Sequence, residues 1–153
     1  MAKTKIDLYR AVMGKTYKIK VGIYPGDGVL DPRWESHTYV NKTTGREVTS
    51  RADVVIEAGA DGPEVLPGNG TSLHDVPGWF PTSDFWIPEG TEYSDELIIT
   101  KDEKQKSSPS NPLLKGYHYR IECKTRMTVV MMKGYLNNMA RAAVARQCEL
   151  AKS

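Results

Sequence analysis

The sequence predicts an α+β fold in which a mainly antiparallel β-sheet precedes one long C-terminal helix. Glycine and proline are dense between Pro25 and Pro112, which is typical of strands joined by turns and loops. Proline is then absent, and good helix formers fill residues 127–152. Strands followed by a single late helix are characteristic of the α+β class.

The length and charge of the chain favour one soluble domain spanning residues 1–153. Positive and negative side chains are interspersed and the net charge is +2, so no broad field attracts nucleic acid or a lipid surface. The N-terminus lacks the apolar run of a signal peptide, and no stretch could span a membrane. Cys123 and Cys148 have no paired spacing that would indicate zinc or a disulfide framework. We therefore expect a protein that acts in the cytoplasm.

The first half of the chain contains two predicted strands and a hairpin. Residues 6–12, "IDLYRAV", form an apolar and aromatic run typical of a strand. Residues 16–24, "TYKIKVGIY", alternate strictly and predict a second strand. Residues 37–50 predict a hairpin around Thr44-Gly45. Residues 53–58, "DVVIEA", fit either a strand or a short helical turn.

The second half predicts three more strands and the helix. The strands fall within residues 84–90, 96–103 and 116–124, and residues 101–112 read as an exposed charged loop without apolar anchors. Within residues 127–152, apolar side chains recur at helical spacing, which predicts a face buried in the core. These are Met132, Leu136, Met139 and Ala143.

The stretch "PGNGTSLHD", residues 67–75, reads as a polar turn that ends in two hydroxyl side chains. Glycines at positions 68 and 70 allow tight bending and close approach of a ligand to the backbone. Thr71 and Ser72 could hydrogen-bond such a ligand, or they could only satisfy backbone groups of the turn. Both interpretations stay open at this point.

Two strands carry further candidates for chemistry. On residues 116–124, alternation places His118, Arg120 and Glu122 on the face opposite Tyr119. Such a row is either ordinary solvated surface or the acid, phosphate ligand and base of a small metal-independent ribonuclease.

The other strand is residues 6–12, where Arg10 shares an apolar face with Leu8. An inward arginine requires an anion or an ion pair with a carboxylate such as Glu57. A third, non-enzymatic interpretation is a binding module that uses three tryptophans on loops, Trp34, Trp79 and Trp86.

Taken in order along the chain, these segments resemble a known toxin family. "LYRAV", "GTSLHD", "FWIPEGT", "GYHYRI" and the tail "MKGYLNNMARAAVARQCELAK" are together similar to the type VI secretion exported effector 2 family. The similarity runs nearly end to end and is weakest over residues 25–65. It implies an ADP-ribosyltransferase-like fold with a split antiparallel sheet, and a cytoplasm-acting toxin that uses NAD as co-substrate without a metal, either to modify a target or to hydrolyse NAD.

The resemblance also implies roles for individual residues. Thr71, Ser72 and His118 match positions implicated in toxicity, and Arg10 would bind the pyrophosphate or ribose of NAD. Gly70 would permit close approach of the ligand, and Tyr9 or Tyr119 would stack on nicotinamide. His118 stands where the wider superfamily has a catalytic glutamate, with Glu122 a distant substitute.

The same resemblance implies partners. It predicts a macromolecular acceptor and an immunity protein that occludes the cleft. It is also compatible with delivery by a secretion system.

Overall fold

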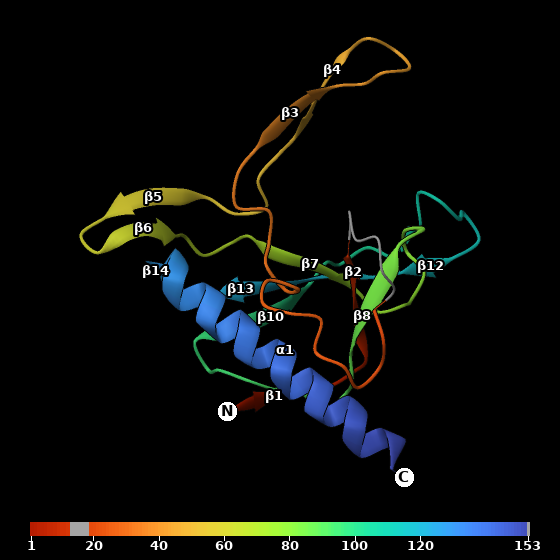
Figure 1. Ribbon diagram of the computed structural model, residues 1–153, viewed down its shortest axis with the longest axis vertical. Coiled ribbons are helices and arrows are strands. Elements are labelled where there is room, and N and C mark those ends of the chain that lie inside the picture. Colours follow the sequence, from red (N-terminus) through yellow and green to blue (C-terminus); the bar gives the residue numbers. More distant parts are fainter. Residues whose placement is uncertain (13–18, 153) are drawn as a thin grey trace.

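The computed structural model describes residues 1–12 and 19–152. These residues form short strands in the first four-fifths of the chain and a single long helix at its end (Figure 1). The elements are β1 (Ala2–Lys3), β2 (Leu8–Val12), β3 (His37–Val40), β4 (Glu47–Ser50), β5 (Ile56–Gly59), β6 (Gly62–Val65), β7 (Gly70–His74), β8 (Ser83–Ile87), β9 (Glu92–Tyr93), β10 (Leu97–Lys101), β11 (Lys106–Ser107), β12 (Lys115–Gly116), β13 (His118–Cys123), β14 (Met127–Thr128) and α1 (Val129–Ala151).

The strands confirm an α+β fold with antiparallel sheets. The central sheet has five strands in the order β10-β13-β7-β2-β8, and every neighbouring pair is antiparallel. A separate three-stranded sheet, β14-β6-β5, lies beside it. The expected hairpin of residues 37–50 is β3 and β4, which project away from the rest of the molecule (Figure 1).

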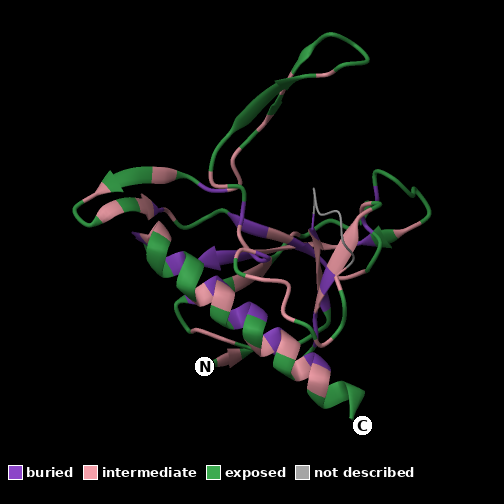
Figure 2. Cartoon of the chain, viewed as in Figure 1, coloured by how far each residue is buried: buried purple, intermediate pink, exposed green. Residues whose placement is uncertain are grey.

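Helix α1 crosses one face of the central sheet and closes the core (Figures 1 and 2). Thr128 caps its N-terminus, because its side-chain oxygen accepts a hydrogen bond from the Met131 amide at 3.1 Å. The predicted stripe of Met132, Leu136, Met139 and Ala143 is fully buried. The opposing sheet residues are also buried, and they include Leu8, Leu73, Phe85, Ile87, Leu97 and Ile121.

The segment predicted as a polar turn is largely a central strand. The turn is confined to Pro67 and Gly68, and Gly70–His74 form β7 between β13 and β2. Composition misled the prediction, because Gly, Thr and Ser are typical of turns. Gly70 is needed for strand pairing, since a Cβ atom there would lie 1.8 Å from the Ile121 carbonyl oxygen. In the structure, the close approach at Gly70 is made by β13.

Gly70→Ala is expected to destabilise the protein by about 3 kcal/mol, because β7 and β13 must separate to admit the methyl group. Gly134→Ala is the matched control. Nothing lies within 4 Å of a Cβ at this exposed helical position, so the same change is expected to stabilise by about 0.5–1 kcal/mol. Urea unfolding of both variants measures the difference. Equal effects at the two positions would contradict the close strand contact.

The predicted strand over residues 16–24 is wrong for its described part, residues 19–24. This segment turns at Gly22, whose φ is 81°. Gln147 of α1 accepts a hydrogen bond from the Gly22 amide at 2.7 Å. Val21 and Ile23 are 61% and 57% exposed, so the alternating pattern does not mark a buried face. Residues 16–18 of the prediction lie outside the described residues.

Two other segments differ in detail from the sequence interpretation. Residues 53–58, which fitted two structures, contain the start of β5 at Ile56. The charged loop of residues 101–112 does have an anchor. Ser108 is buried, and its hydroxyl donates a 2.5 Å hydrogen bond to the Trp79 carbonyl. This anchor is a polar side chain, whereas the prediction considered apolar side chains alone.

Candidate active site

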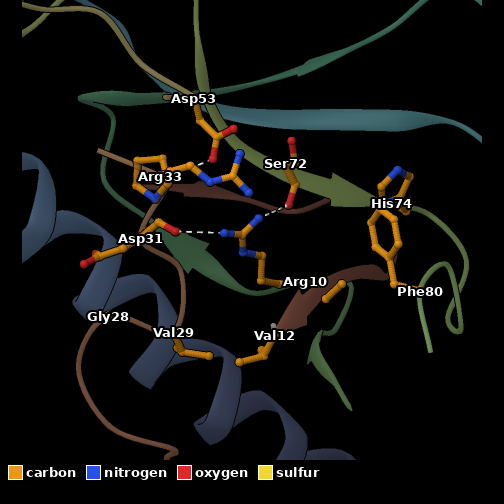
Figure 3. Close-up of a pocket in the computed structure, with 12 residues that line it drawn as sticks. Arg10, Val12, Gly28, Val29, Asp31, Arg33, Asp53, Ser72, His74 and Phe80 are labelled. Atoms are coloured by element: carbon orange, nitrogen blue, oxygen red, sulfur yellow. Dashed lines mark hydrogen bonds between the residues drawn. The ribbon is translucent and has the colours of Figure 1, made fainter. Parts of the chain in front are cut away.

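The central sheet divides at Arg10, and the arginine fills the gap. β2 pairs with β8 along its length but meets β7 only at Tyr9 and His74. The backbones of β2 and β7 are not paired beyond that point, and the side chain of Arg10 bridges them, because its Nη1 donates to the Ser72 carbonyl at 2.9 Å. Arg10 Nη2 donates to the Asp31 carbonyl at 2.9 Å (Figure 3). The guanidinium thus joins β2, β7 and the loop of residues 28–33.

A cleft of about 490 Å³ opens beside this guanidinium, within the size range of small-molecule sites. Its walls come from β2, from the 28–33 loop, and from β7 with the segments beside it (Figure 3). The lining residues are Arg10, Ala11, Val12, Gly28, Val29, Asp31, Pro32, Arg33, Asp53, Ser72, His74 and Phe80. We call this volume the Arg10 cleft.

The lining of the Arg10 cleft carries two guanidiniums, Arg10 and Arg33, and two carboxylates, Asp31 and Asp53. Both terminal nitrogens of Arg10 bond neutral carbonyl oxygens, so these contacts leave its charge uncancelled. Burial lowers the pKa of Arg10 below its ordinary value, and neighbouring Arg33 lowers it further while Asp53 raises it. Arg33 also bonds a carbonyl, that of Arg51, at 2.9 Å. Two guanidiniums in one cleft are suited to a ligand with phosphate groups.

Ser72 connects the Arg10 cleft to a second group of polar side chains. Its carbonyl accepts from Arg10, while its hydroxyl oxygen lies 2.9 Å from His118 Nε2. His118 Nδ1 lies 2.9 Å from Asp102 Oδ2. This hydrogen bond from His118 lowers the pKa of the Asp102 carboxyl. A hydroxyl, an imidazole and a carboxylate are therefore joined in series.

His74 stands beside His118 and is kept neutral by its surroundings. Its ring stacks on Trp79 with centroids 4.1 Å apart, and the centroid of the His118 ring is 5.3 Å away. Burial and then the neighbouring His118 lower the pKa of His74 to about 4. His74 therefore adds no positive charge to this region at neutral pH.

His74 should make stability dependent on pH. Between pH 6.5 and about 4 the unfolded chain takes up a proton at this residue before the folded chain does, so stability falls as pH falls. The loss should reach up to about 3 kcal/mol, and His74→Gln should remove it. Urea unfolding at pH 7 and pH 4.5 tests this, with His37→Gln on exposed β3 as the control. An unchanged pH dependence in His74→Gln would contradict the assignment.

Thr71 and Gly70 precede Ser72 on β7, and neither is among the lining residues of the Arg10 cleft. Thr71 is fully buried, and its hydroxyl donates to the Leu30 carbonyl at 2.6 Å. Arg10 bonds the next carbonyl, that of Asp31, so adjacent peptide groups of the 28–33 loop are both fixed. Thr71 thus shapes the wall of the cleft. The ribose contact expected for it would require the hydroxyl to leave Leu30.

The two tyrosines proposed to stack on nicotinamide lie elsewhere. Tyr119 is on the core face of β13, opposite His118, and it lines a separate cavity of about 280 Å³ with Tyr93 and Ile99. Tyr9 pairs with Trp86 and His74 on the other face and is not among the lining residues of the Arg10 cleft. The aromatic rings in the lining are those of His74 and Phe80.

The face that carries His118, Arg120 and Glu122 is as alternation predicted, but the row is not a free acid-base set. Glu122 is buried and accepts from the Thr100 hydroxyl, and Arg120 Nε lies 3.8 Å from its carboxylate. His118 is held between Ser72 and Asp102. The ribonuclease interpretation is therefore not supported.

The other two sequence alternatives also fail. Glu57 pairs with Arg126 rather than with Arg10. Trp79 is buried, and Trp34 packs against the core. Trp86 lies within β8. The tryptophans therefore do not form an exposed binding surface on loops.

Asp102 and Arg33 were not predicted from the sequence as site residues. Asp102 follows β10, and its amide donates to the His118 carbonyl at 2.9 Å, which extends the pairing of β10 with β13. Asp102 falls within residues 96–103, which were predicted to contain a strand, but nothing in the sequence indicated that this strand pairs with the His118 strand. Arg33 gave no local signal, because it lies in an irregular loop.

Residues 1–12 and 19–152 contain neither a cluster of metal ligands nor a membrane-spanning helix. No group of three or more His, Cys, Asp or Glu side chains there could hold a metal ion. In the same ranges, no helix is both long and apolar enough to cross a membrane.

Comparison with known proteins identifies the family of the chain. The family model described as Tse2 ADP-ribosyltransferase toxin matches residues 4–148. The chain is also 32% identical over 157 residues to the protein named Toxin Tse2 from Pseudomonas aeruginosa strain PAO1, covering 98% of this chain and 95% of that protein. The chain therefore belongs to the Tse2 ADP-ribosyltransferase toxin family, and it is a toxin of the ADP-ribosyltransferase type with NAD as its substrate.

Proposed function

We propose that residues 1–153 act as one ADP-ribosyltransferase-like domain, which binds NAD in the Arg10 cleft and transfers ADP-ribose to a macromolecular acceptor. The observation that carries this proposal is the position of Ser72. Its carbonyl meets the Arg10 guanidinium and its hydroxyl meets His118, so one residue links an anion-binding cleft to an acid-base group.

Arg10 and Arg33 would bind the pyrophosphate of NAD. Arg10 keeps free N–H donors on a guanidinium fixed by two carbonyls, and a rigid planar fork matches phosphate oxygens. The guanidiniums would neutralise the phosphate charge themselves, so we expect NAD binding to need no metal. Turnover that is unchanged by a chelator would agree with this expectation.

Ser72 and His118 would face the nicotinamide ribose. Cleavage of the bond between ribose and nicotinamide develops positive charge on the ribose and leaves neutral nicotinamide. The chain must hold the ribose, stabilise that charge and exclude water until the acceptor arrives. Ser72 would bond a ribose hydroxyl, while Thr71 and Arg10 hold the 28–33 loop through the Leu30 and Asp31 carbonyls.

A toxin of this kind needs a neutralising partner, and we propose an immunity protein that covers the Arg10 cleft. The β3–β4 hairpin supports this idea. Its base is tied to two lining residues, because the Arg33 amide donates to the Asp53 carboxylate at 2.6 Å and the Asp53 amide donates to the Arg33 carbonyl at 2.7 Å. The hairpin is exposed (Figure 2), and a partner that binds it would lie next to Arg33 and Asp53 of the cleft lining. We propose the cytoplasm as the site of action, reached through a secretion system.

The test is release of nicotinamide from NAD by the purified protein, with and without cell lysate. We expect release in both conditions and a marked increase with lysate, together with labelling of a lysate macromolecule by NAD that carries a tagged adenine. Release without any labelled acceptor would indicate NAD hydrolysis instead of transfer. Absence of both binding and release would contradict the NAD site.

A further inference from the structure

Among the residues the structure describes, no carboxylate is hydrogen-bonded to the Ser72 hydroxyl, although the developing charge on ribose is positive. The imidazole of His118 occupies that contact, with Nε2 2.9 Å from the Ser72 hydroxyl oxygen. A neutral imidazole has no net charge to offset a cation. Any negative charge that acts on Ser72 through this contact therefore comes from a group behind the imidazole.

Asp102 is the carboxylate behind His118, and it is held there by three contacts. Its Oδ2 lies 2.9 Å from His118 Nδ1. Its amide donates to the His118 carbonyl at 2.9 Å, which fixes the two main chains together. Arg120 Nη2 lies 3.7 Å from the other oxygen, Oδ1. The carboxylate therefore has one oxygen on His118 and one toward Arg120.

This geometry determines which nitrogen of His118 carries the proton. An ionised carboxylate can only accept, so Nδ1 donates to Asp102. In neutral imidazole Nε2 is then an acceptor, and the Ser72 hydroxyl donates to it. Hydrogen bonds in series polarise one another, so the carboxylate increases the electron density on the Ser72 oxygen.

Building on the proposed NAD site, we propose that Asp102 is a positioning residue, which fixes the His118 tautomer and supplies through it the negative charge that a catalytic glutamate would otherwise bring. The charge reaches the Ser72 oxygen through the imidazole, without direct contact between Asp102 and Ser72. If His118 takes the Ser72 proton as the acceptor enters, the same carboxylate stabilises the imidazolium.

Other charged groups near His118 do not fit this role. Glu122 lies on the same face of β13, but the register places it opposite Gly70, while His118 is opposite His74. Its carboxylate is engaged by Thr100. His74 lies beside His118 and Lys106 acts on Asp102, but neither side chain can carry a negative charge. Asp102 is the carboxylate that contacts His118 among the residues the structure describes.

The experiment compares Asp102→Asn with Glu103→Gln, which removes the adjacent exposed carboxylate from the same loop. The first readout is the tautomer of His118, from nitrogen-15 NMR of the full chain, which has only three histidines. We expect the Nδ1–H form in wild type and in Glu103→Gln. Asp102→Asn should give a mixture with the Nε2–H form.

The second readout is nicotinamide release from NAD. Asp102→Asn should lower kcat by about 10²-fold with little change in KM, because the lost interaction acts on the transition state. Asp102→Glu should restore part of kcat, and Glu103→Gln should match wild type. An unchanged tautomer, or equal kcat in wild type and Asp102→Asn, would overturn the proposal. Because the tautomer is measured without NAD, this readout tests the positioning role of Asp102 separately from the proposed NAD site.

Discussion

Ser72→Ala combined with His118→Gln is expected to abolish growth arrest when the toxin is produced in a host cell. Nicotinamide release should fall by about 10²–10³-fold, because the change removes both the hydroxyl that meets His118 and the imidazole that polarises it. Each single variant should lose nearly as much as the pair, since residues that act as a unit are not additive. Growth curves and the release assay measure the two effects.

The matched control for this prediction is Ser107→Ala with His37→Gln. Both residues are exposed, on β11 and β3, and both lie outside the lining of the Arg10 cleft. This control should arrest growth like wild type. Full toxicity of the Ser72 and His118 variant at equal protein level would show that the pair has no part in the activity.

Arg10→Lys is expected to weaken NAD binding by about 10²-fold or more. A guanidinium bonds the Ser72 and Asp31 carbonyls together, while an ammonium is a compact charge that cannot reproduce that fork. One carbonyl should lose its donor, so stability should also fall by about 1–3 kcal/mol. Calorimetric titration with NAD and urea unfolding measure binding and stability separately.

Arg46→Lys is the control for this substitution, because Arg46 is exposed next to the turn of the β3–β4 hairpin. It should leave both NAD affinity and stability unchanged. A second variant, Arg33→Met, separates charge from folding, since Arg33 is exposed and contributes to the cleft from a loop. It should weaken NAD binding with a smaller loss of stability. Wild-type affinity in both Arg10→Lys and Arg33→Met would contradict the phosphate role.

The sequence was sufficient for features that depend on local periodicity. The stripe from Met132 to Ala143 identified the buried face of α1, since helical spacing is decided within a few turns. Alternation placed Arg10 on the face of Leu8, and placed His118 opposite Tyr119. The same rule failed over residues 19–24, where contacts with α1 hold a turn that alternation cannot detect.

The candidate site could be predicted only in part, because it is made by pairing between distant segments. Because residues 67–75 were interpreted as a turn, β7 was not predicted; its strand conformation depends on pairing with β13 and β2. The missing carboxylate was sought on the His118 strand, at Glu122. The structure has it at the end of the neighbouring strand, at Asp102, which contacts His118 across the sheet.

The central claim is that NAD occupies the cleft between β2, β7 and the 28–33 loop. Its most direct test is a crystal structure of the toxin with a non-hydrolysable NAD analogue. We predict the pyrophosphate within hydrogen-bond distance of Arg10 and the nicotinamide ribose beside Ser72 and His118. An analogue bound at another surface, with the Arg10 cleft empty, would contradict the account.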